Sequence, residues 1–223
     1  MAQIVRVQNF CVSLDGFGAG VGQSLDAPFG RAAEQGDDTP NLPVDLVSWV
    51  MATANWAGRS ELGGSRGVDD RFTRDYDRNI GAEIMGRNKF SPYRGAWEQH
   101  DWQGWWGDTP PFRTPVFVLT HHPRPSLTLA DTTFHFVAGS PAEVLSRAKE
   151  AADGKDVRIG GGVATIRQFL EADLVDEMHV AVAPITIGDG ERLWASPDEL
   201  HDRFHMESIA SPSGVTHLMF WRR

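Results

Sequence analysis

The sequence contains a single cysteine, Cys11, so the chain cannot form an internal disulfide. It also has no apolar run near the roughly 18 residues that a membrane-spanning helix needs. Its first residues, MAQIVRVQNF, lack the basic segment and apolar core of a signal peptide. Because a chain without disulfides suits a reducing compartment, we expect a cytoplasmic protein.

Basic segments are missing as well. The chain has 21 Lys and Arg residues against 30 Asp and Glu residues, and its formal net charge is −9. Because nucleic-acid binding needs concentrated positive charge, we expect neither nucleic acid nor a membrane as a partner. The 41% hydrophobic and 23% charged fractions are typical of a globular protein. A length of 223 residues fits a single domain over 1–223.

Strand-like and helix-like segments alternate along most of the chain. This pattern predicts an α/β fold of three layers, with a mostly parallel central sheet and an antiparallel hairpin over 204–223. Ser140, Pro141 and Glu143 have the spacing of a capping box and predict a helix over 140–154. A second helix is expected over 68–81, with an aspartate near its start as N-cap and a glycine at its end.

Three polar or glycine-rich stretches directly follow predicted strands, at 86–89, 120–124 and 160–165. Ligands bind at the carboxyl ends of the strands in parallel sheets. The third stretch, GGGVAT, opens a helix, and a helix N-terminus can bind an anion. A further phosphate could pair with basic residues of the other two stretches, so the pattern predicts NADP rather than NAD; these residues are Arg87, His121, His122 and Arg124.

Each of these signals has a plainer alternative. The GGG run does not fit the GxGxxG fingerprint and could be a tight turn. The adjacent His121 and His122 could be a solvated strand end, and since no zinc-type ligand spacing accompanies them we expect no metal. The tryptophans between Trp97 and Trp106 could form a loop folded onto the surface, a subunit contact, or an aromatic wall for a planar ligand.

Five segments occur in an order that marks a known family: SLDGFGAG, EIMGRNKF, VFVLTHHPR, DVRIGGGVATIRQFLEADLVDEMHVAVAPITIGDGERLW and GVTHLMFWR. The chain resembles the dihydrofolate-reductase-like family, and within it the stand-alone relatives of the reductase domain of the bacterial bifunctional riboflavin-biosynthesis deaminase–reductase. The resemblance covers nearly the whole chain, without the zinc pattern of a deaminase domain. It implies a homodimeric NADPH-dependent oxidoreductase that reduces a pterin or a 5-amino-6-(5-phosphoribosylamino)uracil-like ring.

The resemblance also implies where the cofactor binds. The loop from Asp15 to Gly20 would close over the nicotinamide, and the diphosphate would face two glycines that are often joined by an unusual peptide bond. Together with the strand-end argument, it gives this set of cofactor-binding residues: Asp15, Gly16, Gly20, Gly86, Arg87, Asn88, Thr120, His121, His122, Gly160, Gly161, Gly162 and Thr165.

Reduction of a C=N or C=O group also needs a proton donor. In the family a carboxylate on the helix before the MGR strand serves, and Asp69 and Asp70 fall there, although either could instead cap the helix. The segment 21–68 departs from the family pattern. Its predicted helix carries Asp45 and Trp49, which could line a substrate pocket, although Trp49 could equally be a core residue.

The sequence is also compatible with two other functions. The same fold could reduce an unrelated carbonyl, imine or flavin-like acceptor. It could also serve as a non-catalytic nucleotide-binding module, because function depends on the site and not on the fold.

Overall fold

The computed structural model describes residues 3–33, 44–57, 64–97, 101–194 and 197–223. The chain divides into two compact units. Unit 1 consists of Met1–Val7 and Asn79–Glu177, and unit 2 of Gln8–Arg78 and Met178–Arg223. Strand β1 (Val5–Ser13) begins in unit 1 and continues in unit 2. The expectation of a single domain stays a prediction.

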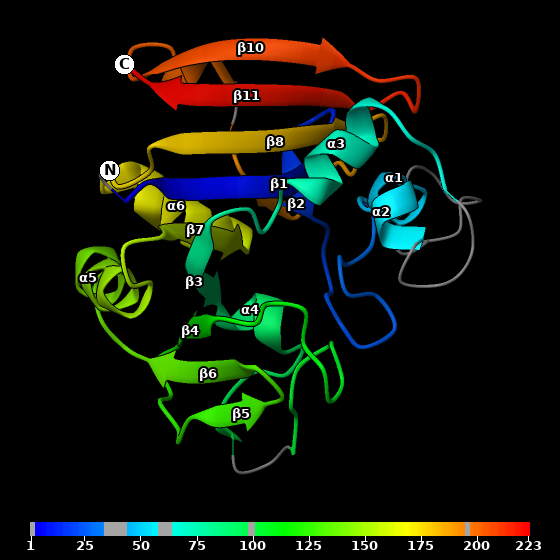
Figure 1. Ribbon diagram of the computed structural model, residues 1–223. Coiled ribbons are helices and arrows are strands. Elements are labelled where there is room, and N and C mark those ends of the chain that lie inside the picture. Colours follow the sequence, from blue (N-terminus) through cyan, green and yellow to red (C-terminus); the bar gives the residue numbers. More distant parts are fainter. Residues whose placement is uncertain (1–2, 34–43, 58–63, 98–100, 195–196) are drawn as a thin grey trace. The chain divides into compact units, whose positions relative to one another are not determined.

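Unit 1 is built on a mostly parallel sheet, shown in the lower half of Figure 1. Its strand order is β1-β7-β3-β4-β6-β5, where β3 is Ile80–Gly86, β4 Pro115–Leu119, β5 Leu127–Leu129, β6 Thr132–Val137 and β7 Asp156–Gly161. Neighbouring strands pair in parallel from β1 through β6, and β5 pairs with β6 in the antiparallel sense. Every residue of β3 is buried, as expected for a central parallel strand covered on both faces.

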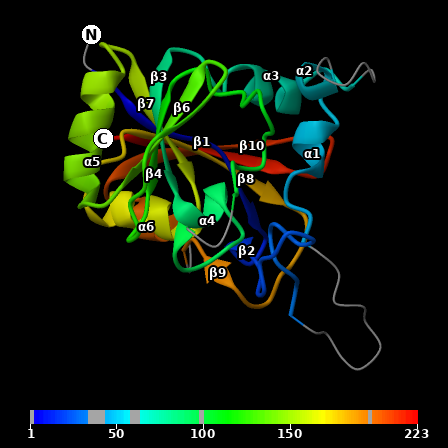
Figure 2. The same ribbon diagram turned by 90° about the horizontal axis from the view of Figure 1, so that it is seen from below.

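Helices α5 (Pro141–Ala151) and α6 (Val163–Glu171) pack against these strands (Figure 2). The predicted capping box of α5 is confirmed, because the Glu143 N–H donates to Ser140 Oγ and the Ser140 N–H donates to Glu143 Oε2. A short helix, α4 (Arg87–Phe90), begins directly where β3 ends.

The tryptophan-rich stretch packs onto the aromatic core of unit 1. Trp97 is buried against Phe90 and Phe136, and Trp102 and Trp106 pack against the same cluster. These contacts agree with a loop folded onto its own domain, which was one of the alternatives for this stretch.

Unit 2 contains the predicted antiparallel hairpin, β10 (Phe204–Ala210) and β11 (Thr216–Arg222). The strand order is β10-β11-β8-β1, where β8 is Glu177–Ala183. The glycine-rich stretch after β1 was expected to be a loop, but it contains a short strand, β2 (Phe17–Ala19). This strand pairs with β9 (Glu191–Arg192), as Figure 2 shows. A 3-10 turn at Pro197–Leu200 precedes the hairpin.

The helices of unit 2 are shorter than the sequence pattern predicted. Helix α3 (Val68–Arg74) begins at the expected residue but ends well before Gly81, which lies in β3 instead. Its N-cap is Gly67, so the prediction of an aspartate N-cap was wrong.

The helix that was predicted to carry Asp45 and Trp49 is interrupted in the structure. It forms two single turns, α1 (Ser48–Met51) and α2 (Ala54–Ala57), and Thr53 between them makes a parallel bridge to Ser65. Across the described ranges, no helix combines the length and the apolar character that crossing a bilayer requires.

Candidate functional site

The register of the unit 1 sheet brings the three predicted stretches to one edge. Gly86 pairs with Leu119, the residue before Thr120, and Met85 pairs with Gly161. The carboxyl ends of β3, β4 and β7 therefore lie level with one another, which is where a parallel sheet binds ligands. This edge of unit 1 is the first candidate site.

The three consecutive glycines have different structural reasons. A Cβ on Gly160 would overlap the carboxylate of Glu83, a buried residue of β3 that accepts hydrogen bonds from Arg158. Gly161 has φ 110°, a backbone conformation that side chains rarely tolerate, and its peptide bond to Gly162 is cis, as the resemblance implied. Gly162 is the N-cap of α6, and a Cβ there would meet no atom within 4 Å. The third of these glycines thus has open space around its α-carbon at a helix N-terminus, whereas Gly160 does not.

Gly86 is required by a close approach from α6. A Cβ on Gly86 would overlap the hydroxyl of Thr165, which is buried against the end of β3. Arg87 and Asn88 follow at once in α4 and are half-buried. The predicted residues Gly86, Arg87, Asn88 and Thr165 therefore lie together at this edge.

Two arginines stack on one tryptophan beside it. The guanidinium carbon of Arg87 lies 3.8 Å from the ring centroid of Trp97, and that of Arg124 lies 4.3 Å from the same centroid and 4.0 Å from that of Phe136. Nη2 of Arg124 donates to the carbonyl oxygen of Trp102. Nε and Nη2 of Arg87 and Nε of Arg124 are buried, and within the described part of the chain they have no hydrogen-bond partner.

The electrostatics of these arginines favour an anion. Burial, and after it the charge of Arg94, lowers the pKa of Arg87. Burial, and after it the charge of Arg87, lowers the pKa of Arg124. Each guanidinium is thus destabilised by loss of water and by a like charge, and a bound anion would relieve both effects.

Trp97 connects the residues after β4 with this arginine pair, because it forms a hydrogen bond with His122 and stacks against both guanidinium groups. Thr120 Oγ1 accepts from the N–H of His122, and Trp97 Nε1 donates to the carbonyl oxygen of His122. The side chains of His121 and His122 are exposed. Trp97 as the platform under both arginines was missed at the sequence level, where it was only one of several crowded tryptophans.

In unit 2 the predicted loop residues have structural partners. Burial alone would raise the pKa of Asp15, but hydrogen bonds from Ser13 and from the N–H groups of Gly188 and Ile187 lower it. Gly16 has φ 83°. A Cβ on Gly20 would overlap the backbone of Arg31. These contacts explain the residue types, and cofactor contact by Asp15, Gly16 and Gly20 stays a prediction.

The two candidate pocket residues take different positions. Trp49 is buried in the core of unit 2, and its Nε1 donates to Cys11 Sγ at 3.4 Å. Asp45 is exposed, and its carboxylate accepts from the N–H groups of Val47 and Ser48 at the start of α1. Both side chains thus have a structural role, and their contact with a substrate stays a prediction.

The two candidate acids on α3 differ sharply. Asp70 is fully buried, accepts from the N–H of Asn55 at 2.7 Å and forms an ion pair with Arg74. Burial would raise the pKa of Asp70, but the hydrogen bond from Arg74 and then that from Asn55 lower it. Asp70 therefore serves to hold α2 against α3.

Asp69 instead begins a chain of buried polar side chains. Its Oδ1 lies 2.7 Å from Nε2 of His217, and Nδ1 of His217 lies 2.9 Å from Nε2 of His179. Nδ1 of His179 in turn lies 2.8 Å from Oδ1 of Asn9 and 3.2 Å from the Asn9 N–H. Phe72 stacks on both imidazoles, with centroid distances of 4.1 and 4.2 Å.

Burial would raise the pKa of Asp69, but hydrogen bonds from His217, Ser211 and Ser213 lower it. Burial lowers the pKa of His217 despite the opposing hydrogen bond with Asp69. Burial, and after it the charge of His217, holds the pKa of His179 well below its usual value.

Both histidines were missed at the sequence level. The available signal was a single polar residue inside an apolar strand, in EMHVAVA and again in THLMFWR.

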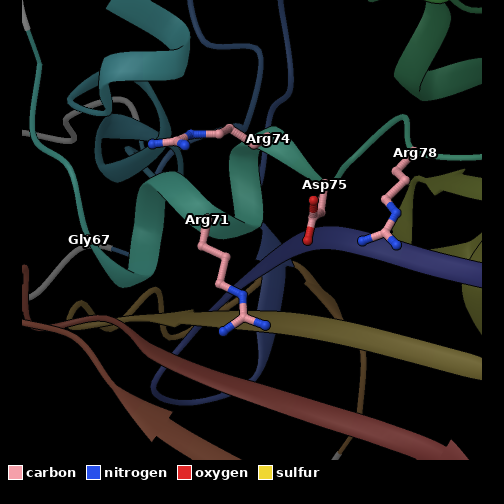
Figure 3. A pocket seen from close by; sticks show the side chains of 5 residues that line it. All are labelled: Gly67, Arg71, Arg74, Asp75 and Arg78. Atoms are coloured by element: carbon pink, nitrogen blue, oxygen red, sulfur yellow. The ribbon is translucent and has the colours of Figure 1, made fainter.

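A pocket of about 450 Å³ lies beside α3 and is lined by Gly67, Arg71, Arg74, Asp75 and Arg78. Figure 3 shows that Arg71 and Arg74 point in different directions, and Arg74 is paired with Asp70. Arg71 and Arg74 therefore do not converge on a common ligand. Among the described residues, no group of three or more His, Cys, Asp or Glu side chains is placed to hold a metal ion.

Solved structures resemble the chain at low identity. A protein provisionally assigned to riboflavin biosynthesis, from Shewanella sp. PV-4, is 22% identical with a TM-score of 0.55, over 100% of this chain and 99% of that one. RibD of Acinetobacter baumannii (form 2) is 15% identical with a TM-score of 0.51, over 100% of this chain and 58% of that one. Dihydrofolate reductase of Enterococcus faecalis is 13% identical with a TM-score of 0.47, over 71% of this chain and 84% of that one.

None of the curated proteins matches the chain. The fold places it among mixed α/β proteins with a large, mostly parallel sheet and a few antiparallel strands, as the sequence predicted. The model of the RibD C-terminal domain family matches residues 7–212. The chain belongs to that family.

Proposed function

We propose that this protein is an NADPH-dependent reductase of the riboflavin-pathway type. Its substrate would be a small heterocycle, either a pterin or a ring like 5-amino-6-(5-phosphoribosylamino)uracil. Membership of the RibD C-terminal domain family supports the reductase class. The observation that carries the choice of NADPH is the pair of arginines on Trp97, with buried N–H groups that lack a partner within the described ranges.

These arginines fit the extra phosphate of NADP. Phosphate oxygens accept hydrogen bonds strongly and pair well with guanidinium groups. A buried N–H group without a hydrogen-bond partner destabilises the folded protein. An anion that accepts a hydrogen bond from such a group removes this destabilisation, which favours its binding. Because Arg87 also begins α4 at the carboxyl end of β3, the anion would lie at the ligand-binding edge of the sheet.

Residues of this chain can be given separate tasks. Arg87 and Arg124 would hold the phosphate on the adenosine side, and Gly162 at the N-terminus of α6 would let the diphosphate approach the backbone. Bound NADPH supplies the hydride. Asp69, the acid with the histidine partner, would deliver the proton that the reduced heterocycle needs.

The direct test compares the binding of NADPH with that of NADH. Binding is measured by the quenching of tryptophan fluorescence. NADPH is expected to bind at least about tenfold more tightly than NADH, equivalent to about 1.4 kcal/mol. Arg87→Gln and Arg124→Gln should each weaken NADPH binding by a similar factor and change NADH binding little.

Arg147→Gln is the matched control. Arg147 is an exposed arginine of unit 1 that also lies over an aromatic ring, 5.8 Å from the centroid of Phe117. Equal affinities for NADPH and NADH in the parent protein would refute the phosphate assignment. Tight NADPH binding without oxidation by dihydrofolate or by the phosphoribosylamino-uracil would refute these two substrates. It would leave a nucleotide-binding module, or a reductase of an unrelated carbonyl, imine or flavin-like acceptor.

A further inference from the structure

The row of hydrogen bonds between Asp69 and Asn9 has room for one proton more than two neutral imidazoles carry. Three contacts of 2.7, 2.9 and 2.8 Å join Asp69, His217, His179 and Asn9 in a row. Both end atoms are acceptors, because Asp69 offers a carboxylate oxygen and Asn9 offers Oδ1 while its Nδ2 donates to the carbonyl oxygen of Phe72. Three links between acceptor ends need three hydrogens, and two neutral imidazoles carry only two.

A third proton would place a hydrogen in each of the three hydrogen bonds and balance the negative charge of the Asp69 carboxylate. With it, one imidazole is positive, the Asp69 carboxylate is negative, and the buried cluster is neutral as a whole. Without it, the cluster carries one buried negative charge, which low-polarity surroundings disfavour. Two extra protons would place two positive charges on stacked rings whose centroids are 5.1 Å apart.

The chain can also exist without the third proton. The Asn9 N–H lies 3.2 Å from Nδ1 of His179 and can donate to it when that nitrogen carries no hydrogen. The structure thus provides a hydrogen-bond partner for Nδ1 in both states. Asn9 lies in the left-handed region, with φ 53°, which asparagine tolerates better than most residues.

The surroundings contain little that would compete for this proton. Phe72 of α3, Trp49 of α1 and Asn9 of β1 face the imidazoles, and none of them is charged. Ser211 and Ser213, which precede β11, donate to Asp69, and the Cys11 thiol lies behind Trp49. The nearby Asp70 is paired with Arg74. In the part of the chain that the structure describes, Asp69 is therefore the charged group in contact with the histidine pair.

We propose that Asp69, His217 and His179 form one unit that stores a single proton and delivers it through Asp69. His217 Nε2–H breaks as Asp69 Oδ1–H forms. That O–H then breaks as the N–H or O–H bond of the reduced product forms. The unit is left with one negative charge and takes up one proton from water through Asp69, whose side chain is 10% exposed. The proposal rests on the reductase function, in which each reduced double bond requires one proton in addition to the hydride from NADPH.

The storage step can be measured without any cofactor, by ¹⁵N NMR of the imidazoles across a pH titration of the whole protein. His217 and His179 should change together in one step that takes up one proton for the pair, on the acidic side of pH 6.5, as the lowered pKa values of both histidines indicate. Asp69→Asn should move this step down by about one pH unit or more, because it removes the compensating charge. His205→Gln, at an exposed histidine of β10, is the matched control and should leave the step unchanged.

Two separate one-proton steps would refute the proposal, and so would an unprotonated pair down to the pH at which the protein unfolds. The parent and Asp69→Asn proteins decide this even if substitutions at the histidines prevent folding. A parent protein that shows the single step but reduces neither dihydrofolate nor the phosphoribosylamino-uracil would refute the proposed function on these heterocycles and leave proton storage by the unit standing.

Delivery is tested by turnover. His217→Gln retains a donor to Asp69 but cannot carry the proton. It should lower kcat by about 10² or more, remove the dependence of kcat on the acidic step, and leave NADPH affinity unchanged. Unchanged kcat with an unchanged pH profile would refute delivery through this unit.

Discussion

His179 is almost fully buried, and its burial links the stability of the protein to pH. The pKa of His179 in the folded protein lies well below its ordinary value of 6.5. Between these two pKa values the unfolded chain binds more protons than the folded one, so the free energy of unfolding falls as the pH is lowered through 6.5. The expected slope is at most about 1.4 kcal/mol per pH unit for one proton. Urea unfolding at about pH 7.5 and about pH 5 measures it.

The control for this prediction is His205→Gln, which removes an exposed histidine from the same unit. It should reproduce the pH dependence of the parent protein, because it leaves the buried His179 and its contacts unchanged. A free energy of unfolding that does not change, or that rises, as the pH falls from 7 to 5 would contradict the burial of a neutral imidazole at His179.

Single residues show which structural roles can be predicted from the sequence and which cannot. The glycine run was recognised as unusual, but Gly160 is explained by Glu83, a residue 77 positions earlier whose side chain fills the space. Asp69 was selected as an acid, yet its partner His217 lies 148 positions away on a strand whose neighbours depend on the whole topology. A polar residue in an apolar strand signals a buried partner, and only the fold identifies that partner.

The junction between β7 and α6 gives a prediction at the scale of elements. A Cβ on Gly162 would meet no atom within 4 Å, and its φ of −73° suits any residue. Gly162→Ala should therefore change the free energy of unfolding little. If the diphosphate approaches the backbone here, the added methyl group should weaken NADPH binding by about tenfold or more, which a fluorescence titration would show.

A matched variant separates ligand approach from packing. Gly160→Ala would place its methyl group against the buried Glu83, so it should lower the free energy of unfolding directly. If Gly162→Ala binds NADPH as tightly as the parent, the open space at the start of α6 is not where the cofactor lies.

Elements with strong local signals were predicted well, and those that depend on distant contacts were not. The capping box located the start of α5 because Ser140 and Glu143 satisfy each other without help from the rest of the chain. Strands β2 and β9 were missed because each is two or three residues long and is defined by pairing with the other. Helix α3 ends at Arg74, and the residues that were expected to continue it lead into β3 instead.

At the scale of the whole molecule, the order of the strands determines which strand of unit 2 could pair with a second copy of the chain. The resemblance implies a homodimer, and the apolar segments of β8 and β11 would be the first candidates for its interface. Within unit 2, however, β11 lies between β10 and β8, and β8 lies between β11 and β1, so both strands already have neighbours. The edge is β10, which has no strand on its outer side among the described residues and exposes Ile209.

We propose that two copies of the chain associate through the β10 edge, since an exposed strand edge can pair with a second one. Light scattering at micromolar concentration should then give twice the 24.6 kDa mass of the chain. Ile209→Lys should shift the protein toward the monomer, because it replaces the exposed apolar side chain of β10 with a charged one. Leu25→Lys changes another exposed apolar residue of unit 2, one outside β10, and should leave the dimer intact. A parent protein with the mass of one chain would refute the dimer, and a dimer unaffected by Ile209→Lys would place its interface away from β10.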